Sequence, residues 1–166
     1  MTLPGTRTVF LLIAIVCAGL IGTALYMEHG MGLEPCYMCM LQRVFVIATG
    51  TVALLAALHN PKVLGQRIYG GLIVLTTLGG SFFSGKQLWL QSLPKDSPYI
   101  PDCGASVSYL FEVETFGNAL AKLLRGDGNC ADVQWTFLGL SIPGWMLICF
   151  IGLAVIAVWQ IARAKR

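Results

Sequence analysis

The chain has 166 residues, of which 56% are hydrophobic and 11% are charged, and its formal net charge is +3. Soluble globular domains carry about 25% charged residues, and disordered chains combine low hydrophobicity with high charge, so both classes are excluded. The length allows one domain, and six cysteines are too few for a small secreted disulfide scaffold.

Four apolar runs follow one another along the chain. They cover residues 9–26, 41–58, 68–90 and 143–162. About 20 predominantly apolar residues, rising ~1.5 Å each, cross the ~30 Å hydrocarbon core of a bilayer. The first run is longer than the apolar part of a signal peptide, and no cleavage site of the A-x-A type follows it. We therefore predict an all-α membrane protein, with residues 1–166 as a single membrane domain built on a bundle of four transmembrane helices.

The charged residues divide between the two sides of the membrane. The amino terminus, the loop at 59–67 and the carboxyl tail hold six basic residues and no acidic side chain. All eight acidic residues fall in the loops at about 27–40 and 91–142. An excess of Lys and Arg marks the cytoplasmic face. We therefore predict a multi-pass protein of the bacterial inner membrane with both termini cytoplasmic and two periplasmic loops, and we exclude nucleic acid as a partner.

The cysteines divide in a similar way. Cys17 and Cys149 lie within the first and fourth runs, where packing is the ordinary role of a small apolar thiol. The other four lie in the outer loops, two in each loop: Cys36, Cys39, Cys103 and Cys130. Disulfides form and persist in the periplasm, so these four are the candidate reactive residues.

The densest chemistry lies at the start of the second run, where Pro35 precedes a C-x-x-C pair formed by Cys36 and Cys39. Proline favours the first position of a helix, so the pair is predicted on the first turn of the second span. Cysteines in C-x-x-C pairs and at helix N-termini have lowered pKa values, and the thiolate is the form that attacks disulfides. Arg43 lies four residues beyond Cys39, on the same helix face, where its charge stabilises a thiolate or an anionic ligand oxygen.

Two other interpretations of the pair stay open. Met38 and Met40 flank Cys39 and supply the soft sulfur ligands that copper(I) prefers, so a copper-binding or metal-delivery protein is one alternative. A purely structural disulfide is the other, although a bridge that closes so short a loop removes little unfolded-state entropy. Zinc is disfavoured because 26 residues separate Cys103 from Cys130. No G-x-G-x-x-G motif follows a strand, so a Rossmann-type flavin site has no support.

The second outer loop has two parts. Three prolines, at positions 94, 98 and 101, are predicted to hold the stretch before Cys103 extended. Apolar residues then recur at helical spacing between Phe116 and Leu124, which predicts a short amphipathic helix, either in the membrane interface or packed on the bundle. A glycine-rich turn at 126–129 precedes Cys130 and leaves it able to change disulfide partners.

In these features the chain resembles the DsbB family of membrane oxidants over essentially its whole length. The resemblance rests on the four spans, on two cysteines in each outer loop, on the outer C-x-x-C followed by Arg43, and on residues 134–140 with Pro143 and Trp145. It implies an enzyme that reoxidises a soluble, periplasmic DsbA-type thiol oxidant. The electrons would pass to membrane quinone, either ubiquinone or menaquinone, and so sustain disulfide formation in exported proteins.

The resemblance also implies roles for the four outer cysteines. Cys103 would form the mixed disulfide with reduced DsbA, and Cys130 would be its resting partner. Cys36 would then exchange with Cys130, while Cys39, left as a thiolate, would donate into the quinone ring.

Two further residues would complete the quinone site. Arg43 would bind the quinone oxygen, and Gln87, near the outer end of the third span, would lie beside it. No metal and no flavin are implied. A vitamin-K-epoxide-reductase-like enzyme shares four-helix redox chemistry, but its C-x-x-C comes late in the chain, whereas here it comes first.

Overall fold

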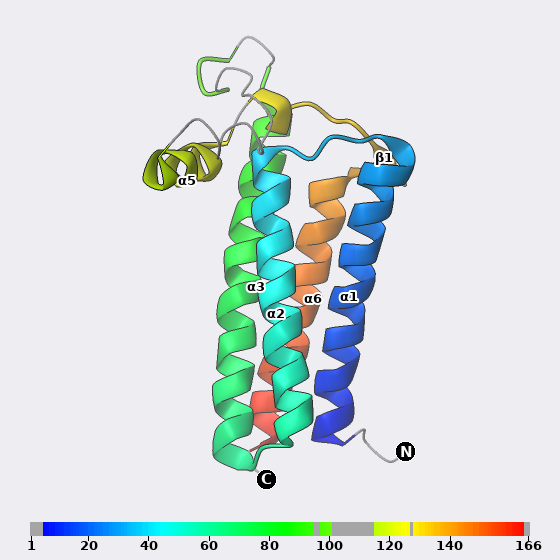
Figure 1. Cartoon of the computed structure of the whole chain (residues 1–166), viewed down its shortest axis with the longest axis vertical. Helices are drawn as coiled ribbons and strands as arrows, with labels where there is room; N and C mark the ends of the chain where they lie inside the picture. The colour runs from blue at the N-terminus through cyan, green and yellow to red at the C-terminus, as the bar shows by residue number, and fades with distance from the viewer. Residues whose placement is uncertain (1–4, 95–96, 101–114, 127, 165–166) are drawn as a thin grey trace.

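Four long helices run side by side as a bundle in the computed structural model, which describes residues 5–94, 97–100, 115–126 and 128–164 (Figure 1). They are α1 (Thr6–Met31), α2 (Tyr37–His59), α3 (Val63–Ser92) and α6 (Ile142–Arg163). Each is long and apolar enough to cross a membrane. The predicted all-α bundle of four membrane-spanning helices is therefore confirmed. Cys103 lies outside the described residues, so its role and its pairing with Cys130 stay predictions.

The helices extend beyond the apolar runs that predicted them. Helix α1 continues through Glu28 to Met31 and is capped by Gly32, whose φ of 68° is left-handed and favours glycine. Helix α2 begins at Tyr37, four residues before its apolar run, and is capped by Asn60, which has a φ of 44°. A count of apolar residues stops at the first polar positions, whereas the backbone hydrogen bonds of a helix continue through them.

The bundle core depends on small residues that bring the helices close together. Helix α3 packs along α6, α1 along α2, and α2 along α3, whereas α1 and α6 meet at only a few positions. A Cβ placed on Gly80 would lie 2.3 Å from the ring of Phe150, so α3 approaches α6 more closely there than any larger residue allows. Phe10, Ile73 and Phe150 are fully buried in this core.

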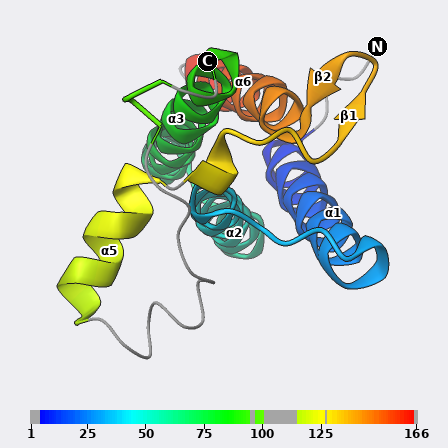
Figure 2. The ribbon, with the colours of Figure 1, turned by 90° about the horizontal axis from the view of Figure 1, so that it is seen from above.

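A second, smaller apolar cluster lies at the end of the bundle opposite both chain termini (Figure 1). Helix α5 (Phe116–Arg125) projects sideways from this end, as Figure 2 shows from above, and buries Ala119 and Leu123 in the cluster. The predicted amphipathic helix is therefore confirmed by the burial of this face, while Leu120 and Leu124 stay exposed. Lys86 of α3 donates to the carbonyl oxygens of residues 124 and 125, at 2.9 and 3.1 Å, and so holds the C-terminal end of α5.

Two short elements connect α5 to α6. The 3₁₀ helix η1 (Gly128–Cys130) places Cys130 in the second cluster. The strands β1 (Thr136–Phe137) and β2 (Leu140–Ser141) then pair as an antiparallel hairpin. The hairpin turn has positive φ at both Leu138 (51°) and Gly139 (79°). The sequence analysis did not predict this hairpin, because its turn lacks the Asn-Gly or Asp-Gly pair that signals one.

The prediction of an extended chain before Cys103 is wrong for residues 97–100. The backbone N–H of Ile100 donates to the carbonyl oxygen of Ser97 at 3.1 Å, which closes a turn. Pro98 is the second residue of that turn, where its fixed φ favours turning as much as extension.

Candidate functional site

The C-x-x-C pair lies at the N-terminus of α2, as the sequence predicted. Cys36 is the N-cap, with φ −72° and ψ 167°, and its Sγ accepts a hydrogen bond from the backbone N–H of Cys39 at 3.4 Å. The two Sγ atoms are 2.7 Å apart and share a proton as hydrogen-bond partners. No disulfide joins any two of the five described cysteines. The pair is therefore present as two thiols already within reach of one another.

Cys130 is brought to the same place by η1. Cys130 is fully buried and Cys36 is 5% exposed, and both belong to the second cluster. Hydrogen bonding with the Cys130 thiol, then with that of Cys39, together with burial, raises the pKa of Cys36 well above its ordinary value. The effect opposes the lowered pKa expected at a helix N-terminus, because Cys36 keeps its proton to donate to neighbouring sulfurs. Cys36 thus contacts a sulfur on each side.

Gln87 of α3 contacts both sulfurs of the C-x-x-C pair. Its Nε2 lies 3.2 Å from Cys36 Sγ and 3.4 Å from Cys39 Sγ, and the side chain is 2% exposed. Its Oε1 accepts a hydrogen bond from Gln42 Nε2 at 2.7 Å. The structure thus places Gln87 against the thiols, and its predicted contact with quinone stays a prediction. Gln42 is a polar residue within an apolar span, which is a signal for such a role, but its contact with Gln87 was not predicted from the sequence.

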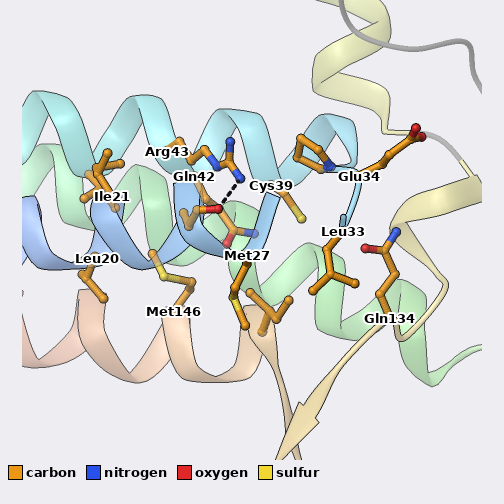
Figure 3. Close-up of a pocket in the computed structure, with 14 residues that line it drawn as sticks. Leu20, Ile21, Met27, Leu33, Glu34, Cys39, Gln42, Arg43, Gln134 and Met146 are labelled. Carbon is orange, nitrogen blue, oxygen red and sulfur yellow. Dashed lines mark hydrogen bonds between the residues drawn. The ribbon is translucent and has the colours of Figure 1, made fainter. Parts of the chain in front are cut away.

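Arg43 is held at the outer end of α2 by groups from two helices. Its guanidinium forms an ion pair with Glu28 of α1, and the two side chains are 19% and 30% exposed. It also donates to the carbonyl oxygen of Ala24 at 3.2 Å, the dashed bond in Figure 3, and contacts Met40 Sδ at 3.8 Å. The ion pair offsets the cost of a charge at the membrane boundary. Glu28 was not predicted as a site residue, although a carboxylate directly after the first apolar run is a signal for one.

A pocket of about 610 Å³, part of it open to its surroundings, lies between α1, α2 and α6 beside these residues (Figure 3). Cys39, Gln42 and Arg43 line its polar side. Leu20, Ile21 and other apolar residues from α1, α2 and α6 form most of the rest. The pocket therefore combines a thiol, a cation and an amide with apolar walls.

A second pocket, of about 290 Å³, lies on the loop side of the pair. Cys36, Cys39 and Gln87 line it together with polar residues that include Asp132. Cys39 and Gln134 line both pockets. The Cys39 side chain thus borders two different cavities.

The first pocket continues toward the gap between α1 and α6. A neighbouring hollow of about 680 Å³ shares Leu20 and Met146 with it and adds the aromatic residues Trp135, Phe137 and Trp145. Trp145 Nε1 donates to the carbonyl oxygen of Phe137 at 3.1 Å, which holds the β hairpin over the start of α6. Tryptophan is typical of the membrane–water interface. The two hollows therefore adjoin between α1 and α6.

Comparison with known proteins agrees with this arrangement. The family described as "Disulfide bond formation protein DsbB" matches residues 6–160. A relative named "Disulfide bond formation protein B" from Saccharophagus degradans is 48% identical over 158 residues, covering 95% of this chain and 94% of the relative. Proteins of the same name from Hahella chejuensis, 49% identical over 160 residues (96% and 94%), and Methylococcus capsulatus, 46% identical over 166 residues (100% and 100%), are similar too. With four apolar helices and a C-x-x-C pair at the head of the second, the chain belongs to the DsbB family.

Proposed function

We propose that this protein is a quinone-dependent oxidoreductase that reoxidises a periplasmic DsbA-type dithiol protein and so sustains disulfide formation in exported proteins. The observation that carries the proposal is the position of Cys36, whose thiol contacts Cys130 of the outer loop on one side and Cys39 of the pocket on the other. Electrons entering at the loop thus have a continuous path of sulfurs to the apolar pocket.

The path follows from ordinary thiol–disulfide exchange. A thiolate of the reduced partner attacks Cys103 of a Cys103–Cys130 disulfide, forming a mixed disulfide and releasing Cys130 as a thiolate. Cys130 then attacks Cys36 of the Cys36–Cys39 disulfide, so that the Cys36–Cys130 bond forms and Cys39 leaves as a thiolate. The second thiol of the partner resolves the mixed disulfide. The partner is then oxidised, and its electron pair is held by Cys103 and by the Cys39 thiolate, while Cys36 and Cys130 remain joined as a disulfide.

The pocket lined by Cys39, Gln42 and Arg43 suits a quinone headgroup. Its walls are mostly apolar, and Arg43 and Cys39 lie on the same side of it. A bound quinone supplies an acceptor for two electrons and two protons. Arg43 would hold and orient the quinone oxygen, Cys39 would supply the thiolate beside it, and the apolar walls would exclude water. Glu28 keeps the guanidinium at the pocket edge through its ion pair.

In the proposed orientation the protein spans the bacterial inner membrane, and both termini lie in the cytoplasm. Glu28, Glu34 and Asp132 lie at the same end of the bundle as the cysteine pair, in loops or at helix ends. The basic residues Lys62 and Arg163 lie at the other end. This distribution supports a periplasmic position for the thiols, by the rule that Lys and Arg mark the cytoplasmic side.

The test combines purified protein with a reduced DsbA-type protein and a short-chain quinone, and measures thiol oxidation and quinol formation together. We expect one quinol for each pair of partner thiols. Cys103→Ala is expected to abolish turnover of the partner, and Cys149→Ala, which alters a thiol within α6, serves as the matched control. A Cys103→Ala variant that oxidised the partner at the normal rate would falsify the assignment.

Arg43→Ala separates the two half-reactions. We expect weakened quinone reduction, with single-turnover oxidation of the partner largely retained. An equal loss of both half-reactions would make Arg43 a structural residue. A thiol count with metal analysis tests the copper alternative, which requires reduced thiols bound to metal in the protein as isolated.

A further inference from the structure

Two glutamines lie buried side by side in neighbouring membrane helices. Gln42 of α2 is 3% exposed and Gln87 of α3 is 2% exposed. Buried polar side chains within a membrane span are costly unless they are hydrogen-bonded, and they commonly mark functional sites. These two are bonded to each other and, through Gln87, to the cysteine pair.

The hydrogen bonds between these groups form one consistent set of donors and acceptors. Gln42 Nε2 donates to Gln87 Oε1 at 2.7 Å, so the oxygen of Gln87 faces α2 as an acceptor. A side-chain amide is planar, with the oxygen and the nitrogen on opposite sides. The nitrogen of Gln87 lies nearest the sulfurs, 3.2 Å from Cys36 and 3.4 Å from Cys39, and the Cys39 thiol also lies 3.8 Å from the Gln87 oxygen. Rotating the amide of Gln87 by half a turn would set two NH₂ groups against each other and point an oxygen at the sulfurs.

We propose that Gln42 is a positioning residue that acts through Gln87, fixing the Gln87 amide so that its two N–H groups point at the sulfurs of Cys36 and Cys39. N–H groups that donate to a sulfur stabilise its thiolate form. The hydrogen bond of Gln42 is to Gln87 and not to a sulfur, so its effect passes through the orientation of its neighbour.

Other charged and titratable groups also face the pair. Cys130 lies in η1, and Asp132 follows it on the loop side. On the pocket side are Glu34 and Arg43, the latter paired with Glu28 of α1. Substitution of Gln42 or Gln87 leaves all of these groups unchanged. A change in the reactivity of the thiols is therefore due to the loss of the glutamine amide.

The inference rests on the proposed function only in taking a thiolate as the reacting form, and its test needs neither quinone nor partner. The full-length protein in lipid nanodiscs is reduced, and the alkylation rate of Cys39 at neutral pH is measured by peptide mass spectrometry. The ultraviolet absorbance of the thiolate is recorded in parallel. Gln87→Met is expected to slow alkylation about tenfold, the effect of losing one hydrogen bond to a charged group. Gln42→Met is expected to slow it about threefold, because the Gln87 amide then loses its fixed orientation.

The double variant provides the decisive comparison. If Gln42 acts through Gln87, the Gln42→Met, Gln87→Met protein is alkylated at the same rate as Gln87→Met alone. Gln91→Met is the matched control, because Gln91 lies one turn further along α3 and accepts a hydrogen bond from Ser141 at 2.7 Å. It is expected to leave both the rate and the thiolate absorbance unchanged.

Three results would overturn the inference: a normal rate for Gln42→Met, a further loss in the double variant, or an equal loss in the Gln91→Met control. Thermal unfolding of every variant separates these outcomes from misfolding, because a purely structural glutamine would lower the unfolding temperature without changing the thiolate absorbance. A protein with the expected alkylation rates but no quinone reduction would refute the proposed function and leave this inference standing.

Discussion

Substituting Gly126 by alanine is expected to move the sulfur of Cys130 away from that of Cys36 without unfolding the bundle. Gly126 has φ 84° and ψ 176°, a backbone conformation almost restricted to glycine. A Cβ there would lie 2.5 Å from the Cε of Met38, which is fully buried beside the cysteines. Gly126 joins α5 to the segment that carries Cys130, so the strain falls on the position of that residue.

The free-energy cost of the substitution has two contributions, the backbone strain at position 126 and the overpacking against Met38. The backbone conformation costs a residue with a side chain about 1–3 kcal/mol. Overpacking a filled core costs about 1–3 kcal/mol, and the flexible end of Met38 absorbs part of it. We take the sum as about 2–4 kcal/mol, and about 1.4 kcal/mol is a tenfold change in an equilibrium. The population with Cys130 against Cys36 should therefore fall by about thirtyfold or more.

The assay is the rate at which Cys36 and Cys130 form a disulfide when a mild thiol oxidant is added to the reduced protein. Cys39→Ser and Cys103→Ala remove the competing partners. The matched control is Gly117→Ala, in the first turn of α5, where a Cβ meets nothing within 4 Å. We expect slow linking in Gly126→Ala and a rate near that of the parent protein in the control. Linking at the control rate would refute the argument that Gly126 determines where Cys130 lies.

Three further predictions concern the ion pair, the bundle core and the Cys36 thiol. Glu28→Gln removes the counter-charge of a half-buried Arg43 and is expected to destabilise the protein by about 1–2 kcal/mol, seen as a lower midpoint of thermal unfolding. Gly80→Ala forces a Cβ to 2.3 Å from a buried phenylalanine ring of α6 and is expected to cost about 1–3 kcal/mol in the same assay. Because its pKa is raised, Cys36 should stay protonated at neutral pH, so its alkylation should be slow there and accelerate only in strongly alkaline solution.

Each of these predictions has a matched comparison. Glu34→Gln changes an exposed carboxylate near the same pocket and should leave the unfolding midpoint unchanged, so an equal loss would contradict the role of the ion pair. Gly85→Ala lies on the same helix as Gly80 with nothing within 4 Å of the added carbon, and an equal effect there would exclude overpacking as the cause. Rapid labelling of Cys36 at neutral pH would contradict its raised pKa.

The four helices were predictable because apolar length alone specifies a membrane span. The side-chain contacts across the bundle were not. Gln42 and Gln87 are 45 residues apart, and whether they meet depends on how α2 and α3 are rotated about their own axes, which composition does not determine. The ion pair between Arg43 and Glu28 depends in the same way on the register between α1 and α2.

The outer loops were the least predictable part. The 3.6-residue period of apolar positions was enough to identify α5, because one face of that helix packs on the cluster. The hairpin at 136–141 has strands of two residues each, too short for any alternation to be recognised. Its turn contains Leu138 in a left-handed conformation that non-glycine residues seldom adopt. The hydrogen bond from Trp145, at the start of α6, to the carbonyl oxygen of Phe137 stabilises a turn that the local sequence does not favour.

Cys39 borders two cavities, and this position bears on how water and the lipid phase are separated at the site. Under the proposed function, one cavity admits water-borne chemistry from the loops and the other admits molecules dissolved in lipid. A single sulfur atom then forms the boundary between the two media. Electrons then pass from a water-soluble partner protein to a membrane quinone across one side chain. The partner does not have to enter the lipid, and the quinone does not have to enter water. Water-soluble reductants reach Cys39 only from the loop side, so they do not contact the quinones dissolved in the membrane.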